Sequence, residues 1–390
     1  MPSDELSGIQ TLIDDYIQRM NNKHPDATIG VVIGAVTPAN PQGGLVFSTP
    51  GIATQGGQSV APNATMPFEL GSVSKVFTAG IYDMLQRTPN FEGTLGERLG
   101  SQMTMSDFVK SIPIQCLAAY ASGFPQDNGH CQLHPSTGFP PGMTATLDSL
   151  FKHLATYDTP AYKPGTTYSY SNLAMSLVAM AALDLDSTDT SAFASAFNAK
   201  LIQYCQTFGV DQGSSPSTVV YSEVDTNNLP VGYDKDFQSK IQPPCSMVEY
   251  GSGGIVSTGA DMLQFLRHCM SAAYPAFMQE YRWQHTSYCS GSEGPITGYG
   301  WFITTETIKN QQIRIVSKDG GVAGFTSWIA LEQRPAPGTA SPRGLFILTN
   351  GPDATTLGKR AFGYLIPPAS APVDEAFLQS AAPAPDPRVH

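Results

Sequence analysis

The stretch Phe68-Glu69-Leu70-Gly71-Ser72-Val73-Ser74-Lys75-Val76-Phe77 decides how the rest of the sequence is interpreted. Ser72 is followed three positions later by Lys75, and apolar residues at helical spacing follow the lysine. The pattern predicts a helix that begins here, with the Lys75 amine beside the Ser72 hydroxyl on one face. A desolvated lysine can accept a serine proton, so the pair is a candidate nucleophile and base. Ser-x-x-Lys also occurs by chance in many helices, so other features must decide.

Length and composition define a broad class of protein. The chain has 390 residues, of which 41% are hydrophobic and 14% are charged, as in globular proteins with room for two structural lobes. Its formal charge of −11 argues against nucleic acid or an anionic membrane as a partner, since both favour basic surfaces. The longest nearly apolar stretch, residues 173–183, is shorter than the roughly 20 residues of a membrane-spanning helix, so no membrane span is expected.

Cysteine usage gives an expectation about the compartment. No Cys-x-x-Cys occurs, and the even number favours disulfide bonds among Cys116, Cys131, Cys205, Cys245, Cys269 and Cys289. The simplest of the possible connectivities joins neighbours, 116–131, 205–245 and 269–289, and would indicate a periplasmic or secreted protein. The alternative is six unrelated thiols in a cytosolic protein. His130, Cys131 and His134 form only a weak metal-binding pattern, so no metal or cofactor is expected.

Hydrophobic periodicity predicts the order of the elements. Residues 28–35 and 44–48 read as a β-hairpin after a helix over 6–20, and later strands are predicted at 301–305, 312–316, 325–330 and 344–348. Helices are predicted at 145–156, 172–183, 190–207, 260–266 and 357–362. Short turns between the late strands favour an antiparallel sheet. The fold class is therefore α/β (α+β), with an antiparallel sheet flanked by helices and a mostly helical inserted lobe.

The same order predicts how the chain is divided. Residues 1–85 join residues 256–366 in a discontinuous α/β lobe, and residues 86–255 form the mostly helical lobe. The Pro/Ala-rich tail, residues 367–390, is expected to be poorly ordered. A cleft between two such lobes is a natural place for a site.

Two further segments supply polar residues. Tyr170 and Asn172 flank the expected start of a helix, and a tyrosine near an ammonium group can act as general acid or base. Lys318-Asp319-Gly320 is placed between two predicted strands, where glycines allow a substrate to approach the backbone. The plain alternatives are a half-buried aromatic residue and a surface turn formed by Asp319-Gly320.

Together, Ser72-Val73-Ser74-Lys75, Tyr170-Ser171-Asn172 and Lys318-Asp319-Gly320 resemble the three motifs of the serine β-lactamase/penicillin-binding-protein superfamily. The second motif is similar to the Tyr-x-Asn of the class C β-lactamase branch. Segments 117–125 and 250–262 are also similar to that branch. The resemblance covers roughly residues 5–365 and implies the β-lactamase/transpeptidase-like fold.

The resemblance also implies roles for individual residues. Ser72 is the acylated nucleophile, Lys75 and Tyr170 move protons, and Lys318 is a base and electrostatic group. The backbone N–H groups of Ser72 and Gly321 form the oxyanion hole. Asn172, Asp319, Gly320, Gln126 and Asn128 are expected to lie along the substrate, Asn172 either on its amide or on Lys75.

Asp319 departs from the family pattern, in which threonine follows the third-motif lysine. A carboxylate there disfavours a substrate carboxylate unless Lys318 neutralises it or the Asp319 side chain points away. We therefore expect a serine hydrolase that forms an acyl-enzyme from a small-molecule or peptide ester or amide: a carboxylesterase, D-amino-acid-type peptidase or acyltransferase. A genuine class C β-lactamase or DD-peptidase is the first alternative, and a non-enzymatic penicillin-binding sensor the second. The oligomeric state stays open.

Overall fold

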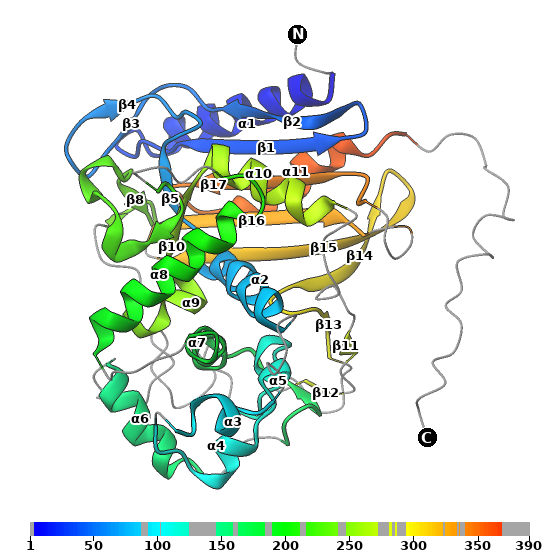
Figure 1. Ribbon diagram of the computed structural model, residues 1–390. Helices are drawn as coiled ribbons and strands as arrows, with labels where there is room; N and C mark the ends of the chain where they lie inside the picture. Colours follow the sequence, from blue (N-terminus) through cyan, green and yellow to red (C-terminus); the bar gives the residue numbers. More distant parts are fainter. Residues whose placement is uncertain are drawn as a thin grey trace, which may run out of the picture.

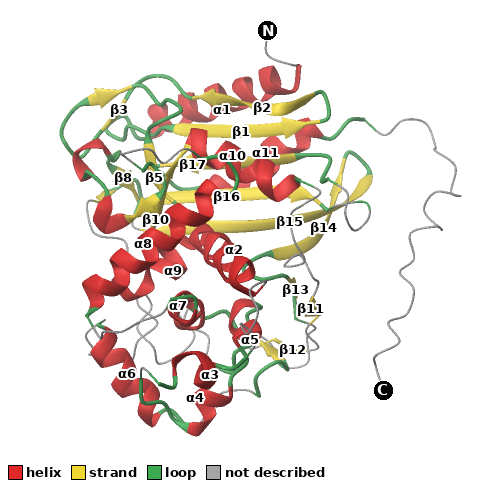
Figure 2. Cartoon of the chain, viewed as in Figure 1, coloured by secondary structure: helices red, strands yellow, loops and turns green. Residues whose placement is uncertain are grey.

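A computed structural model describes most of the chain (Figure 1). The described residues are 4–86, 93–101, 103–124, 146–158, 163–183, 189–210, 216–240, 247–271, 281–282, 285–286, 294–322, 324–333, 335 and 340–368. The secondary structure is mixed, with a large sheet at one end of the molecule and helices at the other (Figure 2).

An antiparallel sheet joins the beginning and the end of the chain. In the described residues it has eight strands, ordered β11 (Tyr281–Arg282), β13 (Ile296–Thr297), β14 (Phe302–Ile308), β15 (Gln311–Val322), β16 (Phe325–Glu332), β17 (Gly344–Thr349), β1 (Val31–Thr37) and β2 (Asn40–Phe47). β1 pairs with β17, with Val31 opposite Thr349. The predicted antiparallel sheet and fold class are confirmed.

Helices cover both faces of this sheet. α1 (Asp4–Lys23) and α11 (Ala354–Leu365) contact each other and one face, whereas α10 (Gly259–Met270) packs on the other. In β17, Leu345 and Ile347 belong to the core under α1 and α11, and Phe346 and Leu348 to the core on the α10 side. Since side chains alternate along a strand, an apolar run such as Gly344–Thr349 fits a strand buried on both faces.

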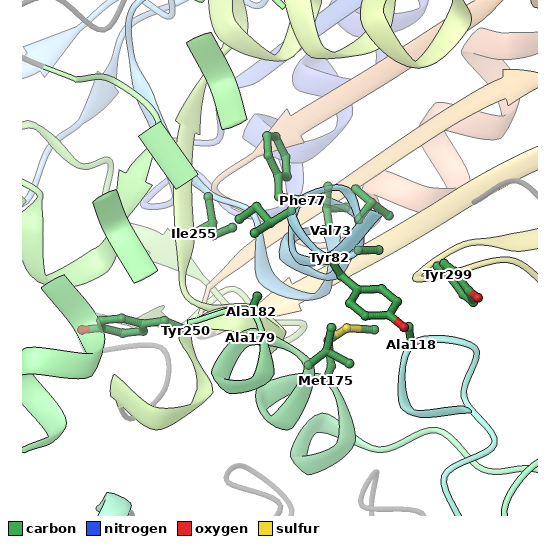
Figure 3. Packing of buried hydrophobic residues seen from close by; sticks show 14 of the residues in the cluster. Val73, Phe77, Tyr82, Ala118, Met175, Ala179, Ala182, Tyr250, Ile255 and Tyr299 are labelled. Atoms are coloured by element: carbon green, nitrogen blue, oxygen red, sulfur yellow. The ribbon is translucent and has the colours of Figure 1, made fainter. Parts of the chain in front are cut away.

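The helical region surrounds α2 (Ser74–Gln86), whose side chains are buried over nearly its whole length. The other helices there are α3 (Leu95–Leu99), α4 (Asp107–Ser111), α5 (Ile114–Ala118), α6 (Leu147–Thr156), α7 (Asn172–Ala181), α8 (Thr190–Gln206) and α9 (Tyr250–Gly253). Figure 3 shows Tyr82 of α2 near Met175 of α7, whereas Phe77 points to the opposite side of α2 and stacks on Phe265 of α10. A helix that is apolar on all sides is a buried helix, and α2 and α7 fit this rule.

The remaining elements are short. They are the strands β3 (Ile52–Ala53), β4 (Ser59–Val60), β5 (Pro67–Glu69), β6 (Thr167–Tyr168), β7 (Val219–Val220), β8 (Gly232–Tyr233), β9 (Ser239–Lys240), β10 (Ile255–Thr258) and β12 (His285–Thr286), and the 3₁₀ turns η1 (Gly71–Val73), η2 (Tyr221–Glu223), η3 (Thr226–Asn228) and η4 (Met247–Glu249). β5 pairs with β10, and this pairing positions η1 and α2.

One prediction about an element is wrong. Lys318-Asp319-Gly320 is not a connection between strands but lies inside β15. Backbone pairing with β16 continues through Lys318 opposite Ile329 and Gly321 opposite Thr326. The apolar pattern stops at Val316, whereas the hydrogen-bonded ladder does not, because a central strand can extend on backbone bonds alone.

Several expectations fall on residues that the structure does not describe. The tail beyond Pro368 and the cysteines Cys131, Cys245 and Cys289 are among them. Cys116 and Cys205 are free thiols within the described residues, but each proposed pairing has one cysteine outside them, so the pairings stay predictions. The boundaries of the two lobes also stay a prediction. Among the described helices, none has the length and apolarity that a membrane crossing requires.

Candidate active site

Ser72 lies at the start of α2, in the 3₁₀ turn η1 between β5 and the helix. Gly71, directly before it, has φ of +50°, a conformation that glycine adopts without strain. The predicted helix therefore begins with a tighter turn at the serine itself. The i, i+3 relation to Lys75 is kept, and Lys75 Nζ lies 2.9 Å from Ser72 Oγ.

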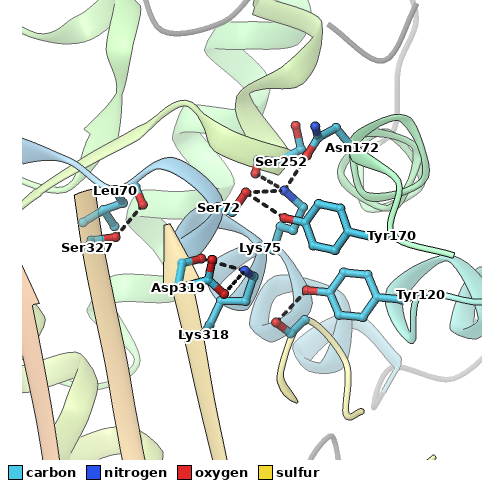
Figure 4. Close-up of polar contacts among 11 residues, drawn as sticks. Leu70, Ser72, Lys75, Tyr120, Tyr170, Asn172, Ser252, Lys318, Asp319 and Ser327 are labelled. Atoms are coloured by element: carbon cyan, nitrogen blue, oxygen red, sulfur yellow. Dashed lines mark hydrogen bonds and ion pairs between the residues drawn. The ribbon is translucent and has the colours of Figure 1, made fainter. Parts of the chain in front are cut away.

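Lys75 is fully buried and donates three hydrogen bonds (Figure 4). Its ammonium group donates to Ser72 Oγ, to Asn172 Oδ1 at 2.7 Å and to the Ser252 carbonyl oxygen at 2.6 Å. Since an ammonium group has three N–H bonds, these acceptors satisfy it and fix its position. All three acceptors are uncharged, and they come from three separate segments of the chain.

Tyr170 approaches Ser72 from the helical region. Its hydroxyl donates to Ser72 Oγ at 2.7 Å, and Lys75 Nζ lies 4.9 Å from the centre of its ring. Tyr120 stacks on the Tyr170 ring at 5.2 Å and donates its own hydroxyl proton to the Gly300 carbonyl at 2.8 Å. Stacking on Tyr120 thus restricts the position of the Tyr170 ring.

The local sequence explains how Tyr170 and Asn172 come to face Lys75. Ser171 is the N-cap of α7, and its side chain accepts a hydrogen bond from the Ala174 N–H. Asn172 is therefore the first residue of the helix, and Tyr170 stands just outside it. The predicted helix start at Asn172 is confirmed, and the structure places Asn172 on Lys75, one of the two locations expected for it.

Lys318 and Asp319 of β15 form a local ion pair. The Lys318 side chain is 1% exposed and donates to the Asp319 carbonyl oxygen at 2.6 Å and to Asp319 Oδ1 at 3.2 Å. Burial lowers the pKa of Lys318, and the Asp319 carboxylate opposes this shift. The ammonium group of Lys318 in turn holds the pKa of Asp319 below its usual value.

Glycines allow β15 to lie directly against the Ser72 turn. A Cβ on Gly320 would lie 2.1 Å from the Leu70 carbonyl oxygen, and a Cβ on Gly71 would lie 2.6 Å from the Gly321 nitrogen. Ser327 of β16 donates its hydroxyl proton to the same Leu70 carbonyl at 2.7 Å. These contacts bring the backbones of Ser72 and Gly321 together, which suits the expected pair of oxyanion donors.

The geometry unites Ser72, Lys75, Tyr170 and Asn172 in one hydrogen-bonded cluster, with Lys318 Nζ 5.4 Å from the Tyr170 ring centre. Gln126 and Asn128 lie outside the described residues. Sequence reasoning missed Ser252 and Tyr120. Ser252 acts through a backbone carbonyl, which no side-chain pattern reports, and only its place in the segment 250–262 could have marked it.

Within the part of the chain that the structure describes, no group of three or more His, Cys, Asp or Glu side chains is arranged to hold a metal ion. His130, Cys131 and His134 are not among the described residues.

Ser72, Lys75 and Tyr170 thus form a buried cluster at the start of α2, next to β15 of the large sheet. The model of the Beta-lactamase family matches residues 28–365, and the chain belongs to this family of serine hydrolases. Comparison with curated proteins by sequence gives no match.

Solved structures of the same fold are similar over nearly the whole chain. A class C beta-lactamase has a TM-score of 0.65 and 17% identity, covering 93% of this chain and 96% of its own. The D-alanine carboxypeptidase AmpC from Burkholderia cenocepacia has a TM-score of 0.63 and 18% identity, covering 92% and 99%. A beta-lactamase/D-alanine carboxypeptidase from Pseudomonas syringae has a TM-score of 0.64 and 18% identity, covering 92% and 98%. At this identity the likeness shows the fold.

Proposed function

We propose that the protein is a serine hydrolase that cleaves ester or amide bonds through an acyl-enzyme on Ser72. The observation that carries the proposal is the position of Ser72 Oγ, which lies 2.9 Å from Lys75 Nζ and 2.7 Å from the Tyr170 hydroxyl. Both groups can exchange a proton with the serine without moving, as a nucleophile and its base require.

In the proposed reaction, the Lys75/Tyr170 pair starts one proton short, as a neutral amine or a phenolate, and Ser72 Oγ attacks the substrate carbonyl carbon while its proton passes to this pair. The carbonyl oxygen becomes an oxyanion that accepts hydrogen bonds from the N–H groups of Ser72 and Gly321. When the intermediate collapses, the bond to the leaving group breaks and the pair returns the proton to the departing oxygen or nitrogen. Water, or another hydroxyl or amine acceptor, then attacks the ester on Ser72 by the same steps in reverse.

Asn172 and Ser252 are proposed to hold Lys75 during these transfers. Each accepts one hydrogen bond from the ammonium group, so the third N–H bond points at Ser72 Oγ. A base that is positioned by two fixed acceptors loses little freedom when it reacts, and this preorganisation favours the transition state.

The substrates that we propose are those of a carboxylesterase, a D-amino-acid-type peptidase or an acyltransferase. The ion pair between Lys318 and Asp319 supports this choice, because the Lys318 charge already has a counterion. A β-lactamase or DD-peptidase is the second candidate, favoured because the structural relatives are a class C beta-lactamase and a D-alanine carboxypeptidase. A sensor that is acylated without turnover is the third.

A comparison of three substrates tests these candidates. We expect wild type to hydrolyse p-nitrophenyl butyrate, and kcat/KM to fall at least about 10³-fold in Ser72→Ala. An ester rate that does not respond to this mutation would refute the nucleophile. Faster turnover of a chromogenic cephalosporin or a D-alanyl amide would favour the second candidate, and a stable adduct by mass spectrometry without turnover would favour the sensor.

We also propose that the protein functions in the periplasm or outside the cell. The even number of cysteines supports this, because disulfide bonds persist in oxidising compartments. Peptide mapping without reductant tests the proposal. Linked peptides at 116–131, 205–245 and 269–289 are expected, and six alkylatable thiols in protein from its native source would contradict it.

A further inference from the structure

Lys318 is a buried cation whose charge is already used inside the protein. Its two hydrogen bonds both go to Asp319, and the rings of Tyr170 and Phe302 each lie 5.4 Å from its ammonium nitrogen. A substrate carboxylate would have to share this ammonium group with the Asp319 carboxylate, which already accepts one of its N–H bonds and matches its charge. Lys318 is therefore poorly placed to attract an anion.

Asp319 places a negative charge at the exposed surface of β15. Its side chain is 61% exposed, and both Lys318 and, less strongly, Lys75 lower its pKa, so the carboxylate is ionised at neutral pH. Burial alternates along this part of the strand, where Lys318 and Gly320 are buried and Asp319 and Gly321 are exposed. The exposed carboxylate thus stands on the strand that runs past Ser72.

The surface of β15 beside this carboxylate is open at Gly321. A Cβ built on Gly321 would meet no atom within 4 Å, whereas one on Gly320 would collide with Leu70. The exposed edge of β15 at Asp319 and Gly321 is therefore open next to the backbone that approaches Ser72. A group of the substrate that lies along β15 would meet this carboxylate.

We propose that Asp319 is a specificity-determining residue, which occupies the charge of Lys318 so that the site no longer attracts a substrate carboxylate and favours substrates with an uncharged group along β15. This inference rests on the proposed function, because it concerns substrates that acylate Ser72. It names their chemical class as esters or amides without a carboxylate on the leaving-group side.

The test uses two esters that differ in one charge, 3-carbamoylphenyl butyrate and 3-carboxyphenyl butyrate. We expect wild type to favour the carbamoyl ester in kcat/KM by about tenfold or more, which corresponds to about 1.4 kcal/mol. Asp319→Asn is expected to reduce this ratio to about threefold or less. Asp107→Asn, which removes one exposed charge from α4 in the helical region, is the matched control and should leave the ratio unchanged.

A second measurement separates this inference from the proposed nucleophile. Binding of both esters to Ser72→Ala by calorimetry needs no turnover, and the same preference is expected there, reduced by the added Asp319→Asn. If Ser72→Ala hydrolyses the esters as fast as wild type, the proposed function fails whatever the ratio. If wild type shows no preference in either assay, or Asp319→Asn keeps the preference, the specificity role of Asp319 is refuted.

Discussion

Two buried lysines lie close to Ser72, and their surroundings differ. Lys75 donates to oxygen atoms of Ser72, Asn172 and Ser252, which belong to three distant parts of the chain, whereas Lys318 donates to its own neighbour Asp319. The ammonium group of Lys75 is held by uncharged acceptors and links these three segments to one another. The ammonium group of Lys318 is paired with the carboxylate of the adjacent residue and connects no distant segments. Burial alone therefore does not tell what a lysine does.

The largest effect is expected from Lys75. Lys75→Met fills the same volume but leaves Ser72 without its base, so kcat/KM for p-nitrophenyl butyrate should fall about 10³-fold or more. The exchange also removes the Lys75 donor from the Asn172 and Ser252 oxygen atoms, so a stability loss of about 1 to 3 kcal/mol is expected as well. Activity assays and thermal unfolding measure the two effects.

The same change at Lys318 is the direct comparison. Lys318→Met should reduce kcat/KM by only about 10- to 100-fold, because it removes a nearby charge that stabilises the oxyanion but not the proton acceptor of Ser72. Equal losses in the two variants would show that the contrast between the two lysines is wrong.

A loss between those of Lys75→Met and Lys318→Met is expected when Tyr170 is changed. Tyr170→Phe removes the hydroxyl that contacts Ser72 Oγ and should lower kcat/KM about 10²- to 10³-fold. Tyr120→Phe removes a hydroxyl from the ring stacked on Tyr170, and it should cost about 1 kcal/mol of stability through the lost Gly300 bond but much less activity. A larger kinetic loss in Tyr120→Phe than in Tyr170→Phe would contradict the assignment of Tyr170.

The contact between β15 and the Ser72 turn is tested by one methyl group. Gly320→Ala places a Cβ against the Leu70 carbonyl and should destabilise the fold by about 1 to 3 kcal/mol, with lower activity because Ser72 and Gly321 move apart. Gly363→Ala, in α11, has only Ile308 at 4.0 Å and should be neutral or slightly stabilising. Urea unfolding compares the two, and an unchanged midpoint in Gly320→Ala would show that the contact is not tight.

Glu69 is a third buried ionisable group, and its Oε2 has no hydrogen-bond partner. Burial raises the pKa of Glu69 from 4.5 to about 8, so between these values the folded state holds a proton that the unfolded state has lost. Stability should therefore fall as pH rises through this range, by about 1.4 kcal/mol per pH unit at most.

Glu69→Gln removes this dependence. Relative to wild type it should gain on the order of 2 kcal/mol in the free energy of unfolding between pH 5 and pH 7.5. Urea titrations at the two pH values measure the gain, and the exposed Glu223→Gln is the control. Parallel stability profiles of wild type and Glu69→Gln would mean that the carboxyl is not held in its neutral form.

Much of the fold could be predicted because its signals are local. The apolar runs of β1 and β17 mark strands, and Ser171 before the apolar helix α7 marks a cap. The i, i+3 spacing of Ser72 and Lys75 survives the change from α-helix to a 3₁₀ turn at the serine. These features depend on neighbours within a few residues, which a sequence displays directly.

What could not be predicted depends on distant contacts. Lys318-Asp319-Gly320 has the composition of a turn, and only pairing with β16 and the packing of Gly320 on Leu70 make it strand. Ser252 holds Lys75 through a carbonyl oxygen that every residue type possesses. The sequence also left open whether the Asp319 side chain pairs with Lys318 or points away, and the geometry shows the ion pair.

The position of β1 between β2 and β17 determines when the sheet can be completed during synthesis. Val31 is made early but waits for Thr349, which a ribosome working at about 5 to 20 residues per second adds only tens of seconds later. Until then one edge of β1 has no partner, and the Ser72 turn lacks the strand that carries Gly320 and Ser327. A nascent chain therefore contains Ser72 long before the strands that pack against its turn have been made.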